Sequence, residues 1–206
     1  MGQEIDLMIN YPRPKRNVQV RGASKTDIDR ALARKFGKEF FDGDRAHGYG
    51  GFSYHPRFWQ PVIPTFQQHW GLTSASSVLD VGCAKGFMIH DFAELIPGIT
   101  VKGIDISEYA IQNAIKDMRS HVEVADAKSL PYPDKSFDYV ISITTIHNLD
   151  RVELNKSLQE IERVARLGSF ITVDAYRNDE EKERMFAWNL TAKTILHVDE
   201  WKELFK

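Results

Sequence analysis

The sequence predicts an α/β protein with a doubly wound, mainly parallel sheet. Short apolar segments alternate with helical patterns from about residue 77 onward. Such alternation is typical of parallel strands that are joined by crossover helices on both faces of a sheet. The expected strands cover 78–82, 100–106, 121–126, 137–143 and 169–175, and the expected helices between them cover 86–95, 108–117 and 152–166.

Composition narrows the class of protein further. The 206 residues include 27 basic and 29 acidic side chains, and a net charge of -2 argues against binding to nucleic acid or to an anionic membrane surface. One cysteine excludes a disulfide framework and a multi-cysteine zinc site. No apolar run approaches the ~18 residues of a membrane span, and no signal-peptide pattern follows the first residue. We therefore expect a soluble, cytoplasmic protein.

The first 70 residues differ from the rest and are treated as an N-terminal region, followed by a domain over 71–206. An extended arm to about residue 23 precedes a short helix for which Ser24 and Thr26 are candidate N-caps. A segment dense in glycine and aromatic residues follows, and a further helix is expected from about 56 to 70. The charged run over 178–184 is expected to be a solvated helix face.

The turn after the first expected strand carries the most specific pattern. It reads Asp-x-Gly-x-Ala-x-Gly over 80–86, which is not the G-x-G-x-x-G of dinucleotide sites. Asp80 at the strand end suits a cationic amine and would repel a pyrophosphate. Asp105 follows Gly86 by 19 residues, a distance that suits a ribose diol, and Asp126 ends the third strand, where it could read an adenine amine. Amine, ribose and adenine together describe S-adenosylmethionine.

The same segments resemble the class I S-adenosylmethionine-dependent methyltransferases, in particular the small-molecule group that includes the ubiquinone and menaquinone methyltransferases. The similarity lies in VLDVGCAKGF (78–87), in GIDIS (103–107) and in the segment 125–149, and it covers about residues 70–175. It implies a Rossmann-like fold, methyl transfer and S-adenosyl-L-methionine as the cofactor, with S-adenosyl-L-homocysteine as product. The cofactor-binding residues that it implies are Asp80, Gly82, Cys83, Ala84, Gly86, Asp105, Ile106, Asp126, Ala127 and Thr144.

Simpler interpretations remain open for parts of this pattern. The glycine turn alone could be a tight strand–helix connection, and Cys83 could be a small buried residue. An NAD-binding domain is a competing interpretation, which the missing third glycine and Asp80 disfavour.

Methyl transfer from a sulfonium is an in-line displacement, so the protein has mainly to align a nucleophile and exclude water. An oxygen or nitrogen nucleophile that carries a proton also needs a base, and His147 after the fourth strand is the candidate. The alternative is that His147 caps a helix or fills the core. Ile143-Thr144-Thr145-Ile146 stands where nucleic-acid methyltransferases carry Asn/Asp-Pro-Pro-Tyr, which argues against such substrates.

Three further residues are candidates for contact with the substrate. Tyr49 and Tyr54 lie in the glycine and aromatic segment, which could close as a lid over the cofactor or simply anchor the loop. Arg177 follows the fifth strand and could clamp a carboxylate or phosphate, or be an ordinary surface arginine. The seven histidines show no metal-ligand spacing, so we expect a metal-independent reaction.

The predicted function is methyl transfer to an oxygen or nitrogen of a small molecule. A non-catalytic S-adenosylmethionine-binding regulator is the alternative, and a nucleic-acid methyltransferase is a weaker one. The resemblance implies seven strands, of which the last two are antiparallel, whereas five are used by Ala175. We therefore expect strands six and seven to be absent. An exposed edge on the fifth strand would favour pairing with a partner, such as a second copy in a homodimer.

Overall fold

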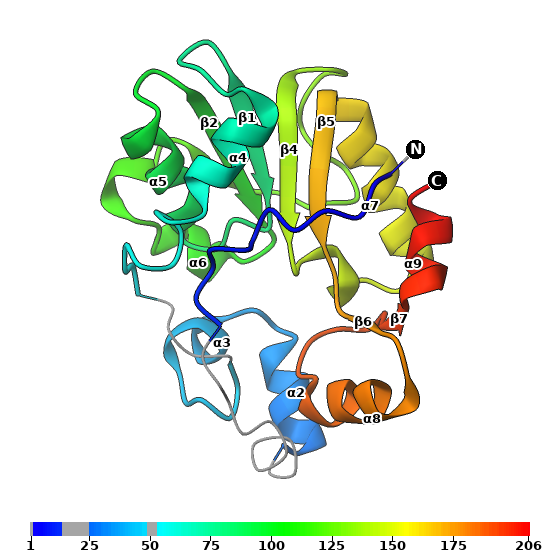
Figure 1. Cartoon of the computed structure of the whole chain (residues 1–206). Coiled ribbons are helices and arrows are strands. Elements are labelled where there is room, and N and C mark those ends of the chain that lie inside the picture. The colour runs from blue at the N-terminus through cyan, green and yellow to red at the C-terminus, as the bar shows by residue number, and fades with distance from the viewer. Residues whose placement is uncertain (1, 14–24, 49–52) are drawn as a thin grey trace.

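Five parallel strands form the central sheet, in the order β3-β2-β1-β4-β5 (Figure 1). The structure is a computed structural model, which describes residues 2–13, 25–48 and 53–206. The order and direction confirm the predicted doubly wound class. The strands are β1 (Ser77–Val81), β2 (Thr100–Asp105), β3 (Val122–Val124), β4 (Phe137–Ile143) and β5 (Ala165–Thr172).

Helices cover both faces of the sheet, because successive side chains of a strand point to opposite sides. Val78 packs into one core with Phe66 of α4 (Ile63–Trp70) and Phe92 of α5 (Phe87–Leu95). Leu79 faces the other way and packs with Ile161 of α7 (Arg151–Val164). A parallel sheet needs cover on both faces, and these two cores supply it.

Two helices are shorter than the sequence predicts. α4 begins only at Ile63, because Pro61 lacks an N–H and suits the turns before a helix better than its interior. α6 (Glu108–Gln112) ends early, and the N–H of Ile115 donates to the carbonyl of Lys85 in the turn after β1. A short 3₁₀ helix, Lys116–Met118, follows.

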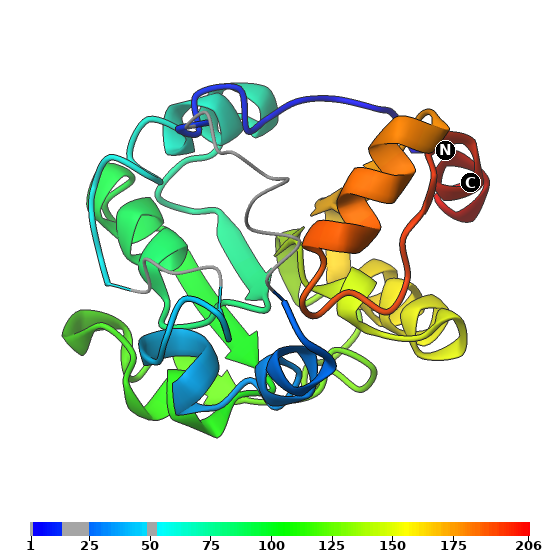
Figure 2. The same cartoon turned by 90° about the horizontal axis from the view of Figure 1, so that it is seen from below.

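A cap lies beyond the carboxyl ends of the strands, and we define it as α2 (Asp27–Ala33), α3 (Lys38–Asp42) and α8 (Asp179–Trp188). Figure 2 shows the blue helices and the orange helix in front of the strand ends. Leu190, just after α8, packs in one small core with Phe40 and Phe41. The Nε of Arg30 also donates to the carbonyl of Asn189 at 3.2 Å. The cap therefore joins the two ends of the sequence.

The chain after β5 adds a second, two-stranded sheet. β6 (Ala175–Tyr176) pairs in parallel with β7 (Leu196–His197), and α9 (Val198–Leu204) follows. Over the ranges given above, no strand pairs with the free edge of β5 and no antiparallel pair extends the main sheet. None of the helices there has both the length and the apolarity that a membrane crossing requires.

Phe66 tests the packing of α4 on the sheet. Its side chain is fully buried and contacts the rings of Phe92 and Phe170. We expect Phe66→Ala to lower the free energy of unfolding by about 3–5 kcal/mol, because the cavity cannot collapse between two rings. Urea denaturation followed by circular dichroism measures this. Ile28→Ala, at a side chain that is 78% exposed, is the control and should change it by less than about 0.5 kcal/mol.

Candidate active site

The turn after β1 is built for a close backbone approach. Gly82 has φ +93°, and a Cβ on it would lie 2.0 Å from Oγ1 of Thr145, so a side chain is excluded there. Gly86 has φ +78° and precedes α5. The N–H groups of Gly82 and Cys83 both donate to the carbonyl of Ile104, which fixes the turn against β2.

Ala84 lies in the middle of this turn, between Gly82 and Gly86. Its φ is +50°, a left-handed conformation that costs an alanine on the order of 1–3 kcal/mol. Its methyl group packs against the small core of the cap. The structure therefore accommodates the alanine, whose methyl group makes packing contacts that a glycine could not make.

Asp105 joins the turns after β1 and β2. Its Oδ2 accepts the N–H of Ala84 and its Oδ1 accepts the N–H of Ser107, each at 2.8 Å. Burial raises the pKa of Asp105, and the two hydrogen bonds counter that rise. Each oxygen keeps a further lone pair, so the predicted ribose contact remains chemically open.

Asp80 is the buried acid of the site. It lies opposite Gly103 of β2 and Ile141 of β4 in the sheet register and is 5% exposed. Burial raises the pKa of Asp80 to about 7, and the charge of Asp105 adds to the rise. A cation that approached this carboxylate would favour its ionised form.

A network that the sequence did not reveal ties the cap to this turn. The Nζ of Lys85 lies 2.6 and 2.8 Å from the carboxylate oxygens of Asp42, at the end of α3. Asp42 also accepts the hydroxyl of Tyr109 at 2.8 Å. Burial alone would raise the pKa of Asp42, but the hydrogen bonds from Lys85 and Tyr109 lower it overall. No spacing signal connects residues so far apart in the chain.

The predicted adenine end lies beyond β2 and β3. Ile106 is 55% exposed, and its side chain offers an apolar surface beside the buried Asp105. Asp126 is half-buried, and its Oδ1 accepts the N–H of Lys128 at 2.9 Å while its Oδ2 lies 3.4 Å from the Nζ of Lys128. Ala127 packs at the border of the core that faces α7.

His147 lies in the 3₁₀ helix Ile146–Asn148 after β4 and is 4% exposed. Its Nδ1 accepts the N–H of Asp174 at 2.9 Å, so the neutral ring carries its proton on Nε2. Burial lowers the pKa of His147, which the charge of Asp174 opposes. The ring is therefore neutral near pH 7, and it can take a proton on Nδ1 only when this hydrogen bond breaks.

Three more residues that were predicted to contact the cofactor or the substrate lie in the core, at the surface and against α5. Cys83 packs into the core against Gly103, and burial raises the pKa of its thiol, so only its backbone faces the turn. Thr144 is exposed, with φ +50°, and its N–H donates to Thr172. Tyr54 donates its hydroxyl to Asp91 of α5.

The structure describes only one of the two remaining predicted substrate contacts. The side chain of Arg177 is 62% exposed and lies 3.5 Å from a carboxylate oxygen of Glu4. Tyr49 falls outside the residues that the structure describes.

The chain is similar in sequence to known methyltransferases. Over 178 residues the chain is 29% identical to the 2-methyl-6-phytyl-1,4-hydroquinone methyltransferase of Synechocystis, covering 79% of this chain and 54% of that protein. Over 148 residues it is 30% identical to the 27-O-demethylrifamycin SV methyltransferase of Amycolatopsis mediterranei, covering 64% and 52%. The chain thus spans about half the length of these relatives.

Solved structures confirm the architecture. The YcgJ protein of Bacillus subtilis superimposes with a TM-score of 0.55 at 20% identity, over 69% of this chain and 65% of that one, which shows the fold alone. The family model described as "Methyltransferase domain" matches residues 72–206, well over half of the chain. The methyl donor of Rossmann-like methyltransferases is S-adenosylmethionine, which agrees with the two buried acids and the glycine turn of this chain. The chain belongs to the methyltransferase-domain family.

Proposed function

We propose that this chain transfers a methyl group from S-adenosylmethionine to an oxygen or nitrogen of a small molecule. The observation that carries the proposal is the turn after β1, where Gly82 leaves no room for a side chain and Asp80 is a buried acid. Two relatives, the rifamycin enzyme and ajmaline N-methyltransferase of Rauvolfia serpentina, carry names with small-molecule acceptors. The acceptors in these two names support a small molecule as the methyl acceptor of this chain.

The residues present fit the cofactor chemically. Over the described parts of the chain, no hydrogen bond reaches the carboxylate of Asp80, which leaves it available to an ammonium group. Asp105 would accept ribose hydroxyls, and the apolar side chain of Ile106 would lie against adenine. The donor supplies an electrophilic methyl group when bound; the chain supplies alignment, a dry surface and, for a protonated acceptor, a base.

Cofactor binding is the first test. We expect S-adenosylhomocysteine and S-adenosylmethionine to bind the chain with one-to-one stoichiometry in titration calorimetry, whereas NAD gives no heat above dilution. Heat with NAD alone would assign the turn to a dinucleotide instead. Binding followed by no methyl transfer to a panel of phenols, hydroxy acids and amines, with tritiated donor, would favour the regulatory alternative.

The pH dependence of binding tests Asp80. Because the pKa of Asp80 is raised to about 7, the carboxyl is mostly protonated at pH 6 and mostly ionised at pH 8. The ionised form attracts the ammonium of S-adenosylhomocysteine, so we expect about tenfold tighter binding at pH 8 than at pH 6. Asp80→Asn should weaken binding at pH 8 and flatten this dependence. An unchanged slope in the variant would place the titrating group elsewhere.

His147 remains the proposed base and is tested by His147→Gln. A glutamine oxygen can still accept the N–H of Asp174, so we expect the fold and the affinity for S-adenosylhomocysteine to be preserved. Loss of the imidazole should lower turnover by about 100-fold or more on an acceptor that must lose a proton. Tritium transfer to an acceptor from the panel measures it. Wild-type turnover would show that the ring only holds the segment after β5.

A further inference from the structure

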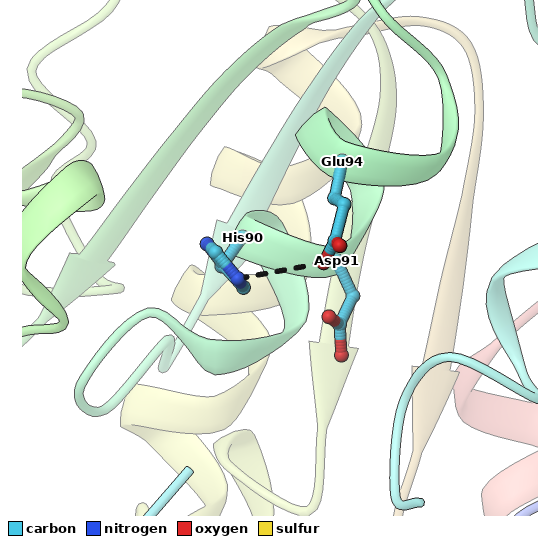
Figure 3. Close-up of side chains that lie close together, drawn as sticks. All are labelled: His90, Asp91 and Glu94. Atoms are coloured by element: carbon cyan, nitrogen blue, oxygen red, sulfur yellow. Dashed lines mark ion pairs between the residues drawn. The ribbon is translucent and has the colours of Figure 1, made fainter. Parts of the chain in front are cut away.

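A further cluster of potential ligands lies on α5, one helical turn after the glycine turn that follows β1. His90, Asp91 and Glu94 each place one potential ligand atom within 4.8 Å of the others (Figure 3). The potential donors are one imidazole nitrogen and two carboxylate oxygens. The methyl transfer proposed above assigns no role to these three side chains.

The spacing of these atoms fits a divalent ion. Nε2 of His90 lies 3.6 Å from Oε2 of Glu94, one helical turn later. An ion that is bound at about 2.1 Å by nitrogen and oxygen holds neighbouring ligand atoms about 3.0–3.4 Å apart. Small side-chain rotations are therefore enough to close the present arrangement around an ion.

Asp91 supplies an independent sign of a missing partner. It is fully buried, and its Oδ1 accepts the hydroxyl of Tyr54 at 2.7 Å. Its Oδ2 is also buried and has no hydrogen-bond partner in the described residues. An unpartnered buried carboxylate oxygen is costly, and a cation beside His90 and Glu94 would satisfy it.

Neighbouring side chains hold the two carboxylates in place. Nε2 of Gln60 donates to Oε2 of Glu94 at 3.2 Å and lies 3.4 Å from the hydroxyl oxygen of Tyr54. The ring of Tyr54 also packs edge-on against that of His90. Such outer hydrogen bonds orient ligands in metal sites. The side chain of Glu94 is 52% exposed, so water and an ion can reach the cluster from that side.

We propose that His90, Asp91 and Glu94 bind one divalent transition-metal ion of the Zn²⁺ type, with water completing its coordination. One imidazole and two carboxylates suit Zn²⁺, Co²⁺ or Ni²⁺ better than Ca²⁺ or Mg²⁺, which prefer oxygen ligands alone. The ion would tie the segment that carries Tyr54 and Gln60 to α5. It takes no part in the methyl transfer proposed above, and the site does not depend on that proposal.

Titration of the tag-free, chelator-treated chain tests the site. We expect ZnCl₂ to bind with one-to-one stoichiometry in calorimetry and to raise the melting temperature. Co²⁺ should give the visible absorption of a low-symmetry site with nitrogen and oxygen ligands. His90→Ala and Glu94→Gln should each weaken Zn²⁺ binding at least tenfold. Glu94→Gln is the more conservative change, because an exposed glutamine preserves the helix.

A matched control uses another histidine–carboxylate pair. Nδ1 of His197 lies 3.4 Å from Asp199, and within the described ranges this pair has no third ligand. His197→Asn keeps a good N-cap for α9 and should leave Zn²⁺ affinity unchanged. No saturable binding, or equal affinity in wild type and in Glu94→Gln, would overturn the proposal and leave a hydrogen-bonded cluster only.

Discussion

The two hydrogen bonds that Asp105 accepts connect the turn after β1 to the turn after β2, and the candidate site depends on them. Without the carboxylate, the N–H groups of Ala84 and Ser107 would lose their partner, since both point at its oxygens. Ser107 in turn donates its hydroxyl to the carbonyl of Phe36, which lies between α2 and α3 of the cap. One buried acid thus fixes the sheet turns, and through them the position of the cap.

The cap brings segments from both ends of the sequence to the candidate site. Asp42 bridges Lys85 and Tyr109, so α3 lies directly against the glycine turn. Leu190 brings the segment after α8 into the same small core. The cover over the turn is therefore built from an N-terminal and a C-terminal segment of the chain.

The buried acids also set how the site responds to charge. Asp80 and Asp105 lie close enough for the charge of one to raise the pKa of the other. A bound cation would offset that repulsion, so ligand charge and acid ionisation are coupled. His147 stays neutral because burial outweighs the attraction of Asp174. The candidate site therefore holds two buried acids whose pKa values are raised and a histidine ring that is neutral.

Local sequence patterns predicted the five strands, their parallel direction and the glycine turn, because apolar periodicity and left-handed positions such as Gly82 and Gly86 are local properties. The sequence also placed Asp80 and Asp105 each at the end of a strand, whereas the pairing of those two strands is a tertiary feature. Which side chains contact one another depends on the tertiary fold. Lys85 pairs with Asp42 from 43 residues away, Tyr54 turns toward Asp91, and Arg177 stays exposed. Such contacts follow from how distant segments pack, which no local pattern encodes.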